Sequence, residues 1–209
     1  MKVEKVAAQP DRAGRHTVKF DDGSVMRLYR QTVEDFGLCA GKELDDTQFQ
    51  QLKIAAGQMS AKMRAVRIIS AGNVSKRDLE HRLIQKGEDQ ENAKQAVAWM
   101  AELNLLDDAK TAEQVVWSCI SKGYGLARAK QALYEKRVPK AYWDDALADY
   151  PDQQERILAF LQNKLGESWD EKDLRRAIDA LIRRGHSYPE IRKALQIFSE
   201  DSDVGEDDV

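Results

Sequence analysis

Apolar and polar residues alternate in the N-terminal part of the chain. The segment HTVKFDDGSVMRLY keeps this alternation on both sides of Asp22-Gly23, a pair typical of the two-residue turn of a β-hairpin. The pattern predicts strands near residues 16–21 and 24–30. Because an isolated hairpin is only marginally stable in water, we expect this short extension, residues 1–45, to pack against a helix.

From Asp46 onward the apolar residues recur at spacings of three and four, which is the period of an α-helix. The first helix is predicted to carry one apolar stripe, made of Leu52, Ala55, Met59, Met63, Val66 and Ile69. Similar stripes follow as far as Leu195. Capping-box spacing, or its aspartate variant, predicts four helix starts, at Ser75/Asp78, Asp152/Glu155, Asp170/Asp173 and Ser187/Glu190. The chain is therefore predicted to be mainly α.

The helical part repeats itself at a period near 49 residues. The segments LEHRLIQKGEDQENAKQAV, AKQALYEKRVPKAYWDDAL and AIDALIRRGHSYPEIRKAL align without a gap, and begin at Leu79, Ala129 and Ala177. Each one has the pattern of a helix that ends at a basic residue, a short break and a second helix, and a further helix precedes each pair. The predicted fold is three tandem three-helix repeats. Because one repeat is too small for a good core, we expect the repeats to stack into an elongated body.

These patterns divide the chain into the N-terminal extension, three repeats at 46–104, 105–150 and 151–199, and an acidic tail at 200–209. The tail, EDSDVGEDDV, holds six of the 36 acidic residues and none of the 33 basic residues, so residues 1–199 have a formal charge of +3. We expect the tail to be disordered because its like charges repel.

The sequence gives little support to an enzyme or a metal site. His16, His81 and His186 lie in separate segments, and Cys39 and Cys119 have neither disulfide nor metal spacing. We therefore expect no catalytic residues, no metal and no cofactor. The sequence has no apolar run long enough to span a membrane and no secretory signal, which favours a cytoplasmic protein.

The segment NLLDDAKTAEQVVWSCISKGYG contains a pair of acids, Asp107 and Asp108. Adjacent residues of a helix diverge by about 100°, so these carboxylates cannot face one another as a catalytic pair. We interpret them as the start of a helix that ends near Gly123 and Gly125. Cys119 lies on the apolar stripe of this helix and is predicted to be a buried hydrophobic residue.

Basic residues recur in every repeat, and the aligned positions Lys86, Lys136 and Arg184 each end the second helix of a repeat. Exposed cations usually do no more than face solvent. Their repetition at equivalent positions instead predicts a cationic track, suited to a repetitive partner that carries carboxylates or phosphates. The candidate partner-binding residues are Lys86, Arg128, Lys136, Arg137, Arg175, Arg176, Arg183 and Arg184.

An ordered set of segments resembles the RecX family of bacterial recombination regulators: SKRDLEHRLIQKGED, LLDDAKTAEQVVWSCISKGYG, GLARAKQALYEKRV and LIRRGHSYPEIRKAL. The likeness covers roughly residues 60–198. It implies three tandem three-helix repeats and a non-catalytic protein of homologous recombination, DNA repair and the SOS response. Such a protein would bind the RecA recombinase, especially its filament on single-stranded DNA, and block filament growth, ATP hydrolysis and strand exchange. We expect it to act as a monomer with at most weak direct DNA contact.

Two positions depart from the family pattern. Arg137 stands where the second repeat usually has a helix-ending glycine, and His186 stands where the third usually has an aromatic residue. His186 is a candidate for pH sensitivity at that corner. Two alternative functions are a DNA-binding regulator of the helix-turn-helix type and a plain helical scaffold. The charge of only +3 and the lack of a helix face rich in Arg, Asn and Gln argue against the DNA-binding alternative.

Overall fold

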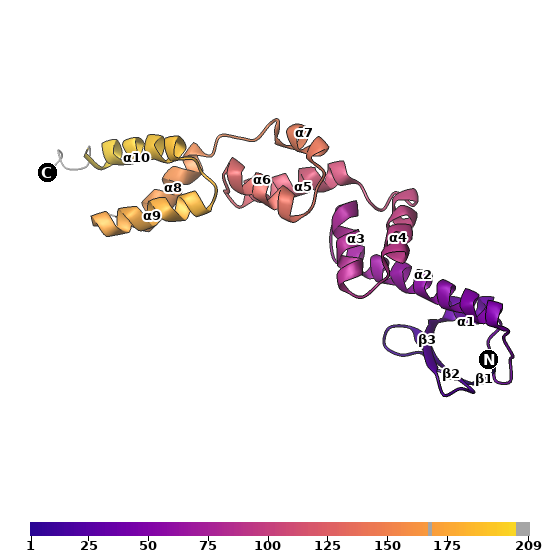
Figure 1. Ribbon diagram of the computed structural model, residues 1–209. Helices are drawn as coiled ribbons and strands as arrows, with labels where there is room; N and C mark the ends of the chain where they lie inside the picture. The colour runs from indigo at the N-terminus through magenta and orange to yellow at the C-terminus, as the bar shows by residue number, and fades with distance from the viewer. Residues whose placement is uncertain (167–168, 204–209) are drawn as a thin grey trace. The chain divides into compact units, whose positions relative to one another are not determined.

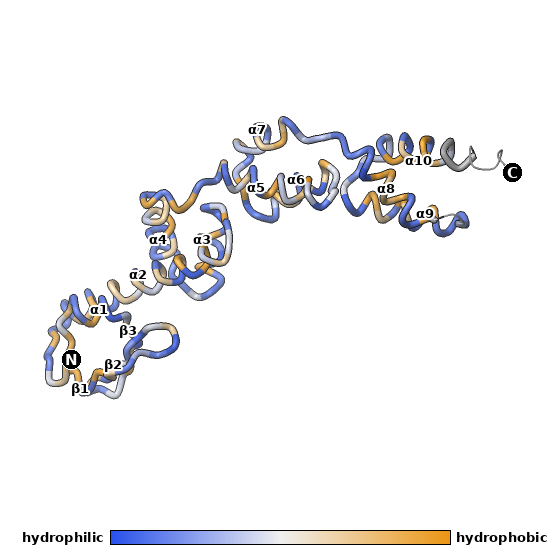
Figure 2. The backbone as a smooth tube through the Cα atoms, turned by 180° about the vertical axis from the view of Figure 1, so that it is seen from behind, coloured by the Kyte–Doolittle hydropathy of each residue, from blue (hydrophilic) through white to orange (hydrophobic). Residues whose placement is uncertain are grey.

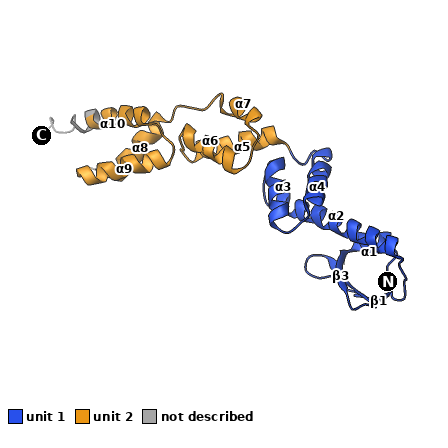
Figure 3. Ribbon diagram, in the orientation of Figure 1, with its two compact units in different colours: residues 1–106 blue, residues 107–209 orange. Residues whose placement is uncertain are grey.

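The computed structural model describes residues 1–166 and 169–203. Within these ranges the chain is mainly α-helical, with a small antiparallel sheet at the N-terminus (Figure 1). It divides into two compact units, residues 1–106 and 107–209 (Figure 3), which are described separately below. In Figure 2 apolar and hydrophilic residues alternate along each helix, as the helical period requires. The predicted fold class, mainly α with an N-terminal β extension, is confirmed.

The N-terminal sheet has three strands, β1 (Val3–Val6), β2 (Arg15–Phe20) and β3 (Val25–Tyr29), in the order β1-β2-β3. The predicted hairpin is the pair β2–β3, and Gly23 in its turn has a φ of 82°. The sequence pattern missed β1, since four residues are too few to establish an alternation. It also missed the short helix α1 (Arg30–Asp35), which lies in the segment expected to be a plain connection.

The sheet packs against α2 (Asp46–Ser70), as expected for a hairpin that needs a helical support. Val18, Phe20 and Leu28 of the sheet share a hydrophobic cluster with Leu52 of α2. The ring of Phe20 also meets that of Phe49 edge to face, with 5.3 Å between the ring centroids. The N-terminal half of α2 thus serves the sheet.

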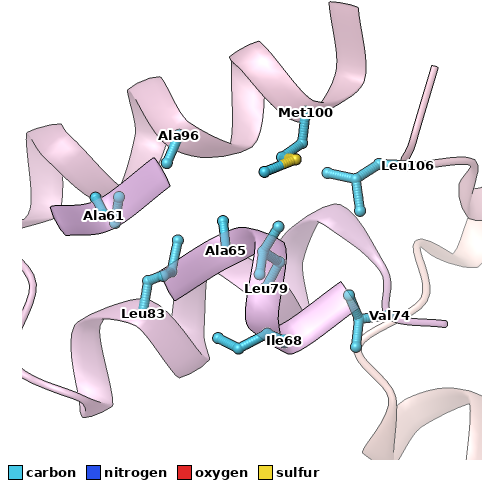
Figure 4. Close-up of a cluster of buried hydrophobic side chains, with 10 residues drawn as sticks. Ala61, Ala65, Ile68, Val74, Leu79, Leu83, Ala96, Met100 and Leu106 are labelled. Atoms are coloured by element: carbon cyan, nitrogen blue, oxygen red, sulfur yellow. The ribbon is translucent and has the colours of Figure 1, made fainter. Parts of the chain in front are cut away.

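The C-terminal half of α2 packs with α3 (Lys76–Gln85) and α4 (Gln90–Glu102) around the cluster drawn in Figure 4. The predicted stripe of α2 is partly wrong here. Of its six residues only Leu52 is buried, and the other buried residues of α2 are Ala61, Ala65 and Ile68. Small side chains occupy this face because α4 approaches closely: a Cβ added to Gly57 would lie 2.6 Å from Nδ2 of Asn92.

The second unit contains the other two helix triplets. The first triplet consists of α5 (Asp108–Ser121), α6 (Leu126–Glu135) and the 3₁₀ helix η1 (Lys140–Tyr142) continued by α7 (Trp143–Leu147). The second triplet consists of α8 (Gln154–Leu165), α9 (Glu171–Arg183) and α10 (Tyr188–Asp203). Each triplet has its own hydrophobic cluster, one centred on Leu133 and the other on Leu161 and Leu181.

Three of the four predicted helix starts are confirmed. Ser75 and Asp170 cap α3 and α9 by accepting the N–H three residues on, and Ser187 and Glu190 form a reciprocal capping box before α10. The start at Asp152 is wrong in detail. Its carboxylate accepts the N–H of Gln154 in a local turn, and α8 begins after Gln153.

The segments proposed from the sequence each contain one of the four hydrophobic clusters, and we propose that they are the structural modules of the chain. Their stacking into an elongated body stays a prediction. The backbone of α10 continues to Asp203, so the first residues of the segment predicted to be a disordered tail are helical. The remainder of that segment, 204–209, lies outside the described residues.

Candidate partner-binding site

The second helix of each triplet ends in the same way. Lys86, Lys136 and Arg184 are the C-cap residues of α3, α6 and α9. After Lys86, the N–H of Gly87 donates to the carbonyl of Ile84 (2.9 Å) and the N–H of Glu88 to that of Leu83 (3.1 Å). The same two bonds recur after Lys136 and Arg184, and together they form a Schellman motif. Each exposed cation therefore lies at the negative end of a helix dipole, on a backbone fixed by two hydrogen bonds.

The residue after each of these cations adopts a left-handed conformation. Gly87 and Gly185 have φ values of 88° and 86°, and Arg137 at the equivalent place has a φ of 53°. The departure of Arg137 from the family pattern therefore leaves the local geometry intact. It carries a conformational cost instead, because a residue with a Cβ is strained in this region by about 1–2 kcal/mol.

Replacing Arg137 by glycine is expected to give a more stable protein than replacing it by alanine. Both variants lose the same side chain, so their difference reports only the left-handed backbone. The strain relieved exceeds the entropic cost of glycine by about 0.5–1 kcal/mol, and the melting temperature of R137G should exceed that of R137A by about 1–4 °C. Calorimetry of the two variants measures this, and equal melting temperatures would contradict the assignment of strain.

Three of the candidate cations are engaged with carboxylates of their own repeat. Arg128 pairs with Glu135 (2.9 Å), and the shared hydrogen bond lowers the pKa of Glu135. Arg175 pairs with Glu171 (2.8 Å) and Arg176 with Asp173 (3.3 Å), both within α9. Such exposed pairs contribute little to stability, yet a partner's carboxylate must compete with them. These three arginines are therefore weaker candidates than the sequence suggested.

The other candidates are exposed, and their surroundings differ. The guanidinium of Arg184 lies over the ring of Phe160 in α8, 4.4 Å from its centroid, which holds its position. In the described part of the chain, Lys86 and Arg183 form no ion pair, whereas Lys136 and Arg137 have interactions within the fold. The structure brings Arg128 and Arg184 close together, as described below. Lys86 lies in the other unit.

The sequence analysis overlooked one exposed apolar residue in each of these helix ends. Ile84, Tyr134 and Ile182 occupy equivalent positions, two residues before the C-cap cation, and are exposed by 41%, 68% and 49%. The preceding leucine is buried in all three helices. The signal was present in the alignment, where these residues follow Leu83, Leu133 and Leu181, but burial cannot be read from sequence where apolar residues are adjacent.

Two glycines form the junction between the triplets of the second unit. The N–H of Gly125 donates to the carbonyl of Arg184 (2.9 Å), and that of Ala127 to the carbonyl of Gly185 (3.3 Å). The end of α9 thus supplies acceptors to the start of α6, which has no side-chain cap. A Cβ on Gly125 would lie 2.1 Å from the oxygen of Gly185, and a Cβ on Gly185 would lie 2.3 Å from the nitrogen of Arg128. Both positions require glycine.

The loop between α5 and α6 offers its carbonyl groups to side chains that follow it in the chain. Arg156 of α8 donates to the carbonyls of Ile120 and Ser121 at the end of α5. The hydroxyl of Tyr150 donates to the carbonyl of Tyr124 (2.7 Å), and burial raises the pKa of Tyr150 to about 12. The GYG and RRG motifs, predicted to be helix ends, therefore also form a contact between two repeats.

His186 completes this junction. Its side chain is 5% exposed, and its Nε2 lies 3.1 Å from the carbonyl of Gly123. Burial lowers the pKa of His186, and Arg184 acts in the same direction, whereas the Gly123 carbonyl and Glu190 oppose the shift. The imidazole is thus neutral at pH 7, with Nε2–H donating to Gly123.

Acidification is expected to destabilise the protein through His186. Because its pKa is lower in the folded state, the unfolded state binds more protons as the pH falls through about 6.5, and the stability contributed above that pH is lost. The melting temperature of the wild type should therefore fall more between pH 7.5 and 5.5 than that of H186F, which cannot titrate. His16 and His81 remain in both proteins as an internal control. Parallel pH profiles would contradict this role.

The acid pair at the start of α5 has a structural role. The Asp107 carboxylate accepts the N–H of Lys110 (3.0 Å), which lowers the pKa of Asp107, and Asp107 is the predicted N-cap. Cys119 is buried, as expected, and desolvation raises its pKa. Among the described residues there is no cluster of His, Cys, Asp and Glu that could hold a metal ion. None of the helices described is both long and apolar enough to cross a membrane.

Known proteins share both this sequence pattern and this fold. A family profile for the second three-helix domain of RecX matches residues 107–147. Regulatory protein RecX of Vibrio campbellii is 29% identical over 152 residues, covering 71% of this chain and 98% of the relative, and that of Clostridium acetobutylicum is 22% identical over 96% of this chain and 98% of the relative.

The fold agrees with that of solved RecX structures. A crystal structure of regulatory protein RecX superposes with a TM-score of 0.60 at 20% identity, and covers 95% of this chain and 98% of the other. RecX from Lactobacillus salivarius superposes with a TM-score of 0.57, and covers 69% of this chain and 98% of the other. Together with the sequence relatives, the ordered motifs and the helix triplets place this chain in the RecX family of regulatory proteins.

Proposed function

We propose that this protein binds the RecA recombinase as a filament on single-stranded DNA and suppresses filament growth, ATP hydrolysis and strand exchange. It acts as a cytoplasmic monomer and catalyses no reaction itself. The observation that carries the proposal is the identical helix end in three successive repeats of a RecX-family chain, each with an exposed cation.

The geometry suits a partner made of repeated subunits. Each C-cap cation is held on a backbone closed by two hydrogen bonds, so little backbone freedom is lost when it meets a carboxylate. One such contact is weak in water. Contacts linked in one chain raise each other's effective concentration, and the whole can bind tightly where a single repeat does not. A chain bound along a filament in this way would obstruct the addition of further subunits.

The test is RecA ATPase activity on single-stranded DNA in the presence of this protein. We expect inhibition at fewer than one molecule per RecA subunit, because a bound molecule blocks growth beyond its own site. Absence of inhibition at excess protein would contradict the proposal.

Binding to DNA without RecA tests the alternative, a direct DNA-binding regulator. That function predicts tight, sequence-selective binding that falls steeply as salt rises. We expect only weak binding, since Arg128, Arg175 and Arg176 are already paired with carboxylates. A preferred DNA sequence bound tightly by this protein alone would favour the alternative.

A further inference from the structure

The second helices of the three repeats share a surface feature that the fold itself does not explain. In each, a buried leucine is followed directly by an exposed apolar residue, and these residues are Ile84, Tyr134 and Ile182. A single exposed apolar residue is common on soluble proteins. An apolar residue at the same exposed position of all three repeats indicates a shared role at that position.

Each of these residues stands beside positive charge. The C-cap cations Lys86, Lys136 and Arg184 follow two positions later on the same rigid helix end. Further cations are near two of them in the helix, with Lys130 one turn before Tyr134 and Arg183 next to Ile182. Each repeat thus presents a projecting apolar side chain with a cation at its edge.

We propose that Ile84, Tyr134 and Ile182, here called the apolar anchors, each insert into an acid-rimmed apolar pocket repeated on the subunits of a protein polymer. The proposal rests on the proposed function and assigns the residues that contact RecA. The apolar side chain fits a pocket, and the neighbouring cation fits carboxylates at its rim.

The chemistry of the anchors favours protein over nucleic acid as the occupant of this surface. Binding to single strands relies on aromatic side chains that stack on bases, and two of the three anchors are aliphatic. A phosphate backbone would require the cations alone, and an isoleucine beside them would add nothing. A protein pocket uses both groups.

The experiment compares single and triple alanine variants of the anchors in full-length protein, by affinity for RecA filaments on single-stranded DNA. Alanine preserves the helix and removes the anchor. Each single variant should bind about tenfold more weakly and the triple variant at least about a hundredfold more weakly, as for residues central to an interface. W117A is the matched control, since Trp117 is 71% exposed on α5 yet lies at no repeated position, and it should bind like the wild type.

The outcomes separate this proposal from the proposed function. If the triple variant binds within about threefold of the wild type, or W117A is weakened equally, the anchors are overturned while RecA binding stands. If the triple variant instead loses affinity for single-stranded DNA in the absence of RecA, a nucleic-acid surface replaces the protein pocket. Failure of the wild type to bind RecA filaments overturns the proposed function and the anchors with it.

Discussion

Replacing Gly185 by alanine is expected to lower the melting temperature by about 6–12 °C, the largest stability effect we predict for a single substitution. Two costs combine. A residue with a Cβ is strained at the φ of 86° by about 1–2 kcal/mol, and forcing that Cβ against the backbone of Arg128 costs a further 1–3 kcal/mol or so. Together they amount to about 3 kcal/mol, which gives the stated shift for a chain of this size.

The clash at Gly185 cannot be relieved locally. The atom that its Cβ would meet at 2.3 Å is the backbone nitrogen of Arg128, in the first turn of α6. Moving that turn away would stretch the hydrogen bond between Gly125 and the carbonyl of Arg184, and the contact of His186 with Gly123. We therefore expect the junction between the two repeats to open in this variant.

Gly87 provides the matched control, because it holds the equivalent position in the first repeat. Its φ is 88°, nearly the same as that of Gly185, but a Cβ there would meet nothing within 4 Å. G87A should therefore lose only the backbone term, about 1–2 kcal/mol or some 2–8 °C. The difference between the two variants measures the junction alone. Equal losses in calorimetry would show that Gly185 is required only for its backbone conformation.

The sequence could predict features that depend on local pattern. The three-residue and four-residue spacing of apolar positions located the helices, and the aspartate-glycine turn located the hairpin β2–β3. The alignment also placed Lys86, Lys136 and Arg184 at helix ends, where all three are C-caps. In each case the physical cause lies within a few residues of the signal: a helical face, a turn or a cap.

Features that depend on tertiary contact could not be predicted. Gly125 and Gly87 look alike in the sequence, yet only Gly125 faces another backbone. The stripe of α2 followed the large residues Met59 and Met63, but the close approach of α4 buried Ala61 and Ala65 instead. The third helix of the second triplet is short, and the chain leaves it before Tyr150-Pro151, since a residue that precedes proline disfavours the helical conformation.

The candidate binding residues illustrate the same limit. Sequence pattern could select arginines and lysines in every repeat, but could not tell which are paired within the fold. Arg175 and Arg176 are paired along one face of α9, while Arg184 is held over Phe160. The three C-cap cations therefore stay the strongest candidates for partner contact, and their role is a prediction that charge reversal tests.

Reversing Lys86, Lys136 and Arg184 together to glutamate is expected to abolish inhibition of RecA ATPase while the helical circular dichroism is retained. Each substitution turns attraction for an acidic partner into repulsion, and the loss is compounded because linked contacts depend on one another. An acid at a helix C-terminus is unfavourable by about 0.3–1 kcal/mol, so a modest fall in melting temperature accompanies the change without unfolding the protein.

The control for this triple variant is a second charge reversal, of Lys94, Lys110 and Arg192, which are exposed and also lie one in each repeat. It changes the net charge equally but leaves the helix ends intact, so it should retain inhibition. Loss in both variants would mean that overall charge steers association, as in any long-range attraction, and the effect would then fade as salt rises. Loss in the helix-end variant alone would locate the contact at the repeated C-caps. Retained inhibition in both would show that these cations only face solvent.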